Sequence, residues 1–417
     1  MSLSVFDLIA VLLVLTATFG WVNHRYIGLP NTIGILAMGL LSSLILIGVE
    51  LAVPHVSLYE SLVALIQQVD FQRTVLNGML AFLLFAGALH VDLTLLRNRA
   101  GVVATMATVG VLISTVVVGV GLWALAGLLG IGLPLSWALV FGALISPTDP
   151  VAVLSTLRAV KVPDQLQIDM TGESLFNDGV GVVVFAVLLA IAIGTESGGI
   201  DFRHVAELFV VEAFGGAALG LAAGYLAYRA MRAIDDYPVE VMISLALATG
   251  AYALATELHL SGPIAVVVAG LLIGNRGPKD AMSDETQRYM FGSWTVIDEI
   301  LNSVLFLLIG LEVLVVRFDT GLGILAALSI PLTLFARFVA VGLPVLALKR
   351  RKPFAAGTIP VLTWGGLRGG ISVAMALSIP EVAEKSQLLA ATYTVVVFTI
   401  IVQGLSLQHL VRRVVRQ

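Results

Sequence analysis

The sequence has no cysteine and few charged residues. The absence of cysteine among 417 residues excludes disulfide bonds, thiolate chemistry and cysteine-ligated metals. Charged residues make up 12% of the chain and hydrophobic residues 59%, whereas soluble domains carry about 25% charged residues. The formal net charge of −4 argues against nucleic acid as a partner. The composition therefore predicts an all-α polytopic membrane protein, and we expect no cofactor.

Both ends of the chain also lack certain features. The apolar run 3–21 has no basic segment before it, so we expect a retained membrane helix there rather than a cleaved signal peptide. The last apolar run ends a few residues before Gln417, and we expect no soluble regulatory domain after it. The six histidines show no metal-ligand spacing.

Long apolar runs account for most of the chain. Runs of about 20 apolar residues between charged or Pro/Gly positions predict membrane spans. We count thirteen of them, at 3–22, 30–49, 74–92, 101–126, 134–158, 168–194, 204–232, 238–257, 261–275, 289–314, 321–348, 357–379 and 388–411. With this division, 17 Lys and Arg residues fall on one side of the membrane and 4 on the other. Because basic loops stay inside, we expect a cell-membrane protein with its N-terminus outside and its C-terminus in the cytoplasm.

Thirteen spans also allow an internal repeat. Spans 1 to 6 (residues 1–194) and 8 to 13 (238–417) are joined by span 7 (195–237). Each span of the first half corresponds to the span seven places later, and because seven is odd, the two halves cross the membrane in opposite orientations. The fifth span is interrupted by Pro147 and Pro150, and its partner, the twelfth, by the glycine-rich run 365–370. Paired interruptions point to a binding site at the membrane midplane. The alternative is that both are packing kinks.

Three carboxylates lie within the fifth and sixth spans, at Asp149, Glu173 and Asp178. A charge at mid-membrane costs roughly 2.5 to 3.5 kcal/mol, so such groups usually line an ion or proton pathway. Asp149 precedes a proline, as an N-cap residue does before the first residue of a helix. We therefore favour a structural role for Asp149, at the positive end of a half-helix, over a transport role.

The prolines of the fifth span also affect backbone hydrogen bonding. In a helix, Pro147 would leave the carbonyl of Ala143 without its partner, and Pro150 would do the same to that of Ser146. A carbonyl without a hydrogen-bond partner at membrane depth must face protein or a water-filled cavity. A hard cation is a natural recipient of such oxygens.

Four polar residues of the sixth span have helical spacing. Glu173 and Asn177 are four residues apart, and so are Ser174 and Asp178, which predicts that all four side chains share one sector of the helix. Their carboxylate, hydroxyl and amide oxygens suit a small hard cation rather than a transition metal. A dedicated calcium or magnesium site would take more anionic oxygens.

Two arginines lie within predicted spans. Arg368, in the twelfth, must be paired, because an isolated guanidinium there would be very costly. We predict Glu173 as its partner, which would leave Asp178 to titrate. For Arg337, in the eleventh span, we predict a structural ion pair.

At these residues the chain resembles a known family. The segments Ser-Pro-Thr-Asp-Pro at 146–150, Gly-Glu-Ser-Leu-Phe-Asn-Asp-Gly at 172–179 and Gly-Leu-Arg-Gly at 366–369 closely resemble those of the CPA1 monovalent cation/proton antiporters. This group includes the NhaP-type exchangers and the animal sodium/proton exchangers. Further similar segments lie at 261–262, 269–271 and 306–311, so the resemblance covers nearly the whole chain.

The resemblance implies a fold and a set of site residues. The implied fold has thirteen helices in inverted six-helix repeats around a linker helix, with dimerisation and mobile core domains interleaved in the sequence and two broken helices that cross. Homodimers are usual in the family. Asp178 resembles the carboxylate that binds cation or proton, with Ser174 and the Thr148 backbone as further ligands. Glu173 would contribute directly or through water, and Arg368 would pair with it. Asn177 before Asp178 resembles the signature of electroneutral exchange.

We therefore expect a transporter that exchanges Na⁺, or Li⁺, for H⁺ one for one. A proton and a cation would exclude each other at Asp178, and K⁺ remains an open alternative. Two hypotheses come from other classes. An intramembrane aspartyl protease could use Asp149 and Asp178 as acid and base, although their setting lacks the expected motif, and a cation channel would move one ion without counter-movement of protons.

Overall fold

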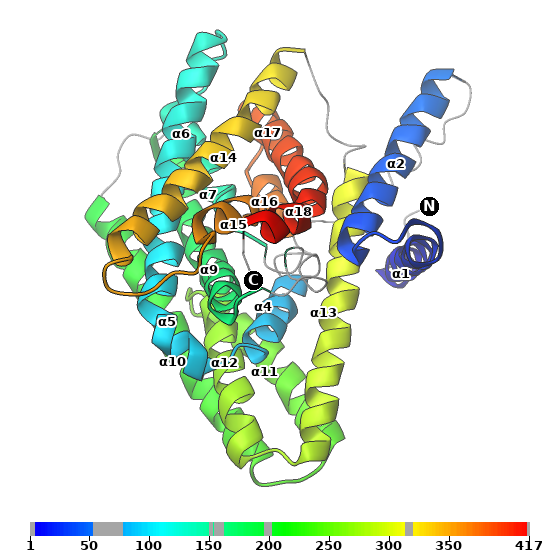
Figure 1. The fold of residues 1–417 in the computed structure, drawn as a ribbon, viewed down its shortest axis with the longest axis vertical. Coiled ribbons are helices and arrows are strands. Elements are labelled where there is room, and N and C mark those ends of the chain that lie inside the picture. The colour runs from blue at the N-terminus through cyan, green and yellow to red at the C-terminus, as the bar shows by residue number, and fades with distance from the viewer. Residues whose placement is uncertain are drawn as a thin grey trace.

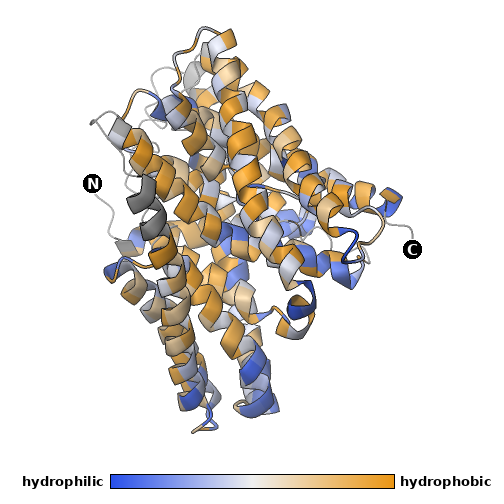
Figure 2. Cartoon of the chain, turned by 90° about the vertical axis from the view of Figure 1, so that its left-hand side faces the viewer, coloured by the Kyte–Doolittle hydropathy of each residue, from blue (hydrophilic) through white to orange (hydrophobic). Residues whose placement is uncertain are grey.

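All regular secondary structure in the described part of the chain is helical. The computed structural model describes residues 5–52, 78–149, 153, 162–195, 202–312 and 320–414, and within them no β-strand occurs. In this part of the chain nine helices are long and apolar enough to cross a membrane, and two shorter apolar helices accompany them. Figure 2 shows hydrophobic residues along most of the helix lengths and hydrophilic residues gathered at the lower ends. The protein is a multi-pass membrane protein.

The described helices span most of the chain. In chain order they are α1 (Val5–Val22), η1 (Asn23–Ile27), α2 (Asn31–Ala52), α4 (Leu80–Leu89), α5 (Leu93–Thr105), η3 (Met106–Gly110), α6 (Val111–Leu128), α7 (Leu135–Leu144), α9 (Asp164–Thr195), α10 (Phe202–Met231), α11 (Tyr237–Glu257), α12 (Gly262–Asp280), α13 (Asp284–Glu312), α14 (Thr320–Leu348), α15 (Thr358–Trp364), α16 (Gly370–Leu377), α17 (Lys385–Phe398), η4 (Thr399–Gln403) and α18 (Gly404–Val414). Each of the thirteen predicted spans contains at least part of one of these helices.

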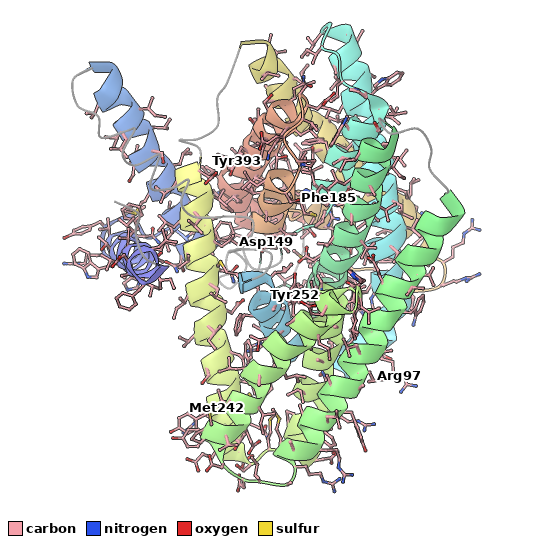
Figure 3. The ribbon with its side chains drawn as sticks, turned by 180° about the vertical axis from the view of Figure 1, so that it is seen from behind. Arg97, Asp149, Phe185, Met242, Tyr252 and Tyr393 are labelled. Carbon is pink, nitrogen blue, oxygen red and sulfur yellow. The ribbon has the colours of Figure 1, made fainter. Side chains whose placement is uncertain are left out.

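The fifth and twelfth spans are both interrupted. Helix α7 ends at Leu144 and the chain is not helical through Asp149, while Pro150 lies outside the described residues. In the twelfth span, residues 365–369 separate α15 from α16. The two interruptions meet, since the Asp149 N–H donates to the Leu367 carbonyl at 2.8 Å. Figure 3 places Asp149 near the centre of the molecule.

The helices pack around two hydrophobic cores. We call α4, α10, α11, α12 and the first half of α13 the lower bundle, because they share one core that includes Phe85 and Trp294. We call α6, α7 and α14 to α18 the upper bundle, whose core includes Phe141 and Tyr393. Figure 1 shows the lower bundle at the bottom of the molecule and the upper bundle above it. Helix α9 contributes to both cores, so it lies where the two bundles meet.

Candidate functional site

Asp178 lies in the middle of α9 and faces a cavity. Its side chain is buried, with 6% of the residue exposed, and it lines a cavity of about 70 Å³ whose other polar residues are Thr148, Asp149, Asn302 and Ser372. Among the described residues, no hydrogen bond or ion pair holds the Asp178 carboxylate. Since a water molecule takes up about 30 Å³, the cavity has room for a small cation with one or two waters.

The cavity lies between the two bundles. Helix α4 of the lower bundle contributes Leu80, Leu83 and Leu84, and the second half of α13, which belongs to the upper core, contributes Asn302 and Leu305. The opposite wall consists of α9, the interrupted end of the fifth span and α16. A relative movement of the bundles would therefore change the surroundings of Asp178.

A second and larger cavity adjoins the first. It has a volume of about 400 Å³, and Gly87 lines both cavities. Its polar lining includes Asp92 and Asp164, which lie at the starts of α5 and α9. One face of α9 continues from this cavity to the first, because Ile168, Thr171, Gly172, Leu175 and Asp178 follow one another at helical spacing. The two cavities therefore adjoin along this face of α9, and Asp178 lines the smaller one.

Thr148, Ser174 and Asn177 form a buried hydrogen-bond network beside Asp178. The Thr148 and Ser174 hydroxyl oxygens are 2.9 Å apart. The Asn177 amide donates to the Thr148 hydroxyl at 2.9 Å and accepts from the Thr148 N–H at 3.3 Å. This network holds the non-helical segment after α7 against α9.

Glu173 is paired with Arg337. Arg337, on α14, donates to both carboxylate oxygens, with 2.9 Å between Nη2 and Oε2, and its Nε donates to the Leu362 carbonyl at 3.2 Å. The predicted structural ion pair of Arg337 is confirmed, whereas the predicted pair of Glu173 with Arg368 is wrong. The reason is the crossing of α14 over the second interruption, since a Cβ at Gly366 would lie only 2.6 Å from Arg337 Nε. The residue at 366 must be small for Arg337 to reach Glu173.

Arg368 contacts the backbone of the other interruption. Its Nη1 donates to the carbonyls of Ser146 and Pro147, the latter at 2.9 Å. The Ala143 carbonyl accepts from the Ser146 N–H at 3.2 Å, so Pro147 does not leave it bare. The prediction that a cation receives the carbonyls of Ala143 and Ser146 is therefore wrong, because the Ser146 N–H binds the first and the Arg368 guanidinium binds the second. Arg368 thus joins the two broken spans.

Asp149 lies beside the N-terminus of α16. A Cβ at Gly369, the N-cap of α16, would collide with the Asp149 carboxylate. The helical segment that was predicted to follow Asp149 lies mostly outside the described residues. Asp149 therefore places its carboxylate beside the positive end of α16, the second half of the other broken span.

Sequence reasoning missed a second buried ion pair on α9. Arg99 of α5 binds Asp169 through Nε at 2.9 Å and through Nη2, and it also donates to the Pro353 carbonyl at 2.7 Å. Asp169 precedes Glu173 by four residues, and this spacing was the available signal. Arg99 was counted only as a loop charge. Asn302 and Ser372, which line the Asp178 cavity, were also missed, since single polar residues in apolar helices carry no pattern.

Comparisons with known proteins show the family of the chain. The chain matches the family model described as "Sodium/hydrogen exchanger, transmembrane" over residues 11–413. It is 47% identical over 414 residues to the Na(+)/H(+) antiporter NhaP of Pseudomonas aeruginosa, covering 98% of this chain and 96% of that protein. It is 36% identical over 379 residues to the Na(+)/H(+) antiporter NhaH of Halobacillus dabanensis, covering 89% and 91%.

A solved structure shares the fold. The sodium proton antiporter MjNhaP1 from Methanocaldococcus jannaschii, determined at pH 8, superimposes with a TM-score of 0.74 over 99% of both chains, at 17% sequence identity. Because the family model and the relatives cover most of its length, the chain belongs to the family of transmembrane sodium/hydrogen exchangers.

Proposed function

We propose that this protein exchanges Na⁺, or Li⁺, for H⁺ across the membrane, one for one, by competition at Asp178. The observation that carries the proposal is the environment of Asp178, a buried carboxylate at a cavity between two bundles with no ion-pair partner among the described residues. Its neighbours on α9, Asp169 and Glu173, are both paired with arginines. The relatives named as Na⁺/H⁺ antiporters support the choice of substrates.

The proposed cation ligands are the Asp178 carboxylate, the Ser174 hydroxyl and the Thr148 backbone. Thr148 lines the cavity with Asp178, and Asn177 fixes Thr148 through two hydrogen bonds. Glu173 acts through water, because Arg337 already binds both of its carboxylate oxygens. Arg368 and Asp149 support the site by joining the two interruptions.

Competition at one carboxylate is sufficient for coupling. A proton and a cation each neutralise Asp178, and neither binds while the other is there. If the Asp178 region crosses between the two aqueous faces only when it is neutral, each passage carries one proton or one cation. The cycle then moves no net charge, so it is electroneutral.

The proposal includes the topology of the chain. Thirteen spans form two inverted repeats, 1–194 and 238–417, joined by 195–237. The N-terminus lies outside and the C-terminus in the cytoplasm of a cell-membrane protein, and two copies form a homodimer. Support comes from the paired interruptions of the fifth and twelfth spans and from the distribution of Lys and Arg in the sequence. The channel and protease hypotheses are set aside, because the family is one of exchangers.

Purified protein in proteoliposomes with an imposed pH gradient tests the proposal. Added Na⁺ or Li⁺ should collapse the gradient, and a response to K⁺ alone would reassign the substrate. The Asp178→Asn variant should be folded and inactive, whereas wild-type exchange in that variant would remove Asp178 from its role. Gly250→Ala serves as a control, since Gly250 lies in α11 with no atom near the added methyl group.

A voltage clamp tests the stoichiometry. One net charge per cycle would couple to the membrane potential at about 2.3 kcal/mol per 100 mV. The exchange rate should stay constant as the clamped potential is varied. A rate that follows the potential would reject the electroneutral form of the proposal.

A further inference from the structure

We propose that Ser372, on the second broken helix, supplies a further oxygen ligand for the transported cation. The inference rests on the proposed function and extends the site from α9 and the first interruption to α16. Ser372 is the third residue of α16. It lines the same cavity of about 70 Å³ as Asp178 and Thr148.

The Ser372 hydroxyl is buried and unpaired. Only 1% of the residue is exposed, and its Oγ has no hydrogen-bond partner within the described part of the chain. Leaving a buried polar group without a partner destabilises the folded state. Thr392 and Ser43, by contrast, donate to the carbonyls four residues earlier, at 2.6 Å and 3.0 Å. The position of Ser372 in the first turn does not provide that bond. The hydroxyls of Thr16, Ser114 and Thr363 are also unpaired, but of these four residues only Ser372 lines the Asp178 cavity.

The residues around Ser372 offer no packing reason for a hydroxyl. Its neighbours on α16, Val373, Ala374 and Ala376, are apolar and fully buried, so an alanine would suit the packing equally well. What the hydroxyl faces instead is a cavity with carboxylates at Asp149 and Asp178. A hydroxyl suits such a site, because its oxygen offers a lone pair to a bound cation.

This placement gives the cation contacts with both broken spans. Thr148 belongs to the first interruption, and Ser372 to the half-helix that follows the second. Hard cations are held by several oxygens at once, and a ligand from each broken span would make cation binding sensitive to their relative position. Ser372 is therefore a binding residue rather than a packing residue.

The test is the Na⁺ dependence of the initial exchange rate in proteoliposomes at one fixed pH. Ser372→Val and Ser372→Thr form a matched pair, since the two side chains have nearly the same shape and only threonine keeps the hydroxyl. Loss of one ligand should raise the KM for Na⁺ about 5- to 10-fold in Ser372→Val, which corresponds to about 1 to 1.4 kcal/mol, with a maximal rate within about twofold of wild type. Ser372→Thr should restore the wild-type KM.

Ser378→Ala is the control on the same helix, because Ser378 lies at its end and its hydroxyl already donates to the Met375 carbonyl at 2.7 Å. It should behave as wild type. An unchanged KM in Ser372→Val, or an equal rise in Ser372→Thr, would overturn the inference while leaving the proposed function in place. A wild-type protein without cation-driven proton movement would overturn the proposed function itself.

Discussion

At the scale of single residues, the buried acidic residues of α9 differ in whether an arginine balances their charge. Asp169 is bound by Arg99 and Glu173 by Arg337, whereas Asp178 faces a cavity. A bidentate guanidinium holds a buried carboxylate in its charged form with good geometry. Of these three acids, only Asp178 has no arginine partner among the described residues.

The pairing of Glu173 with Arg337 leads to a stability prediction. Glu173→Gln and Arg337→Gln each leave one buried charge without its partner and should each cost about 3 to 5 kcal/mol of unfolding free energy. The double variant should be more stable than either single variant. Thermal unfolding in detergent measures all three.

Glu173→Gln combined with Arg368→Gln is the control for this prediction. Because Arg368 binds backbone carbonyls and not Glu173, the two changes should not compensate for each other. Compensation by Arg368→Gln rather than by Arg337→Gln would show that the pair is assigned to the wrong arginine.

The sequence predicts the site residues better than their partners. Spacing within one helix places Glu173, Ser174, Asn177 and Asp178 close together, and the structure then divides them, since Glu173 turns to α14 and Asp178 to the cavity. Which of two arginines reaches Glu173 depends on how α14 crosses the second interruption. That crossing is a tertiary feature that leaves no local pattern in the sequence.

At the scale of helices, interruptions were predictable and lengths less so. Prolines and a glycine run mark the breaks in the fifth and twelfth spans. Helix α12, however, extends over 19 residues, Gly262–Asp280, through Pro278, beyond the predicted 261–275. The π-helical turns η1, η3 and η4 were not predicted, because one wider turn hardly alters an apolar run.

Close helix contacts at glycine give a prediction for α10 and α12. A methyl group at Gly220 would collide with the Ala265 carbonyl, whereas one at Gly250, in α11, meets no atom within 4 Å. Gly220→Ala should therefore destabilise the protein by about 1 to 3 kcal/mol through overpacking. Gly250→Ala should be neutral or stabilise it by about 0.5 to 1 kcal/mol. Equal unfolding temperatures for the two variants in detergent would contradict the packing of α10 on α12.

At the scale of the whole molecule, the arrangement of two bundles could not be read from the sequence. Helices that are apolar on all sides show no preferred face, so periodicity does not tell which helices pack together. Helix α2, for example, packs against α13, and α6 against α14, although these partners are far apart in the sequence. The expectation of separate moving parts came from the family resemblance alone.

The cavity between the bundles predicts that they must move relative to each other during exchange. The cysteine-free chain allows this to be tested with Gly179→Cys and Ile264→Cys, which join α9 to α12, since a Cβ at Gly179 would lie 3.1 Å from Ile264 Cγ1. Oxidation should stop exchange, and reduction should restore it in the same sample. Proton flux in proteoliposomes reports both states.

The control for this cross-link lies within the lower bundle. Gly224→Cys and Ala269→Cys join α10 to α12, where the Cβ atoms would be 3.5 Å apart, within the usual range for a disulfide. Oxidation of this pair should leave exchange unchanged. Full exchange by the oxidised 179/264 pair would show that α9 and α12 do not separate during the cycle.

The most direct test of the account is the pH dependence of the KM for Na⁺ in proteoliposomes. Competition at Asp178 predicts that the KM rises in proportion to the proton concentration on the side where Na⁺ binds, while the maximal rate stays the same. A KM that is independent of pH, with a maximal rate that falls as protons are added, would place the proton at another group and contradict the single-site account.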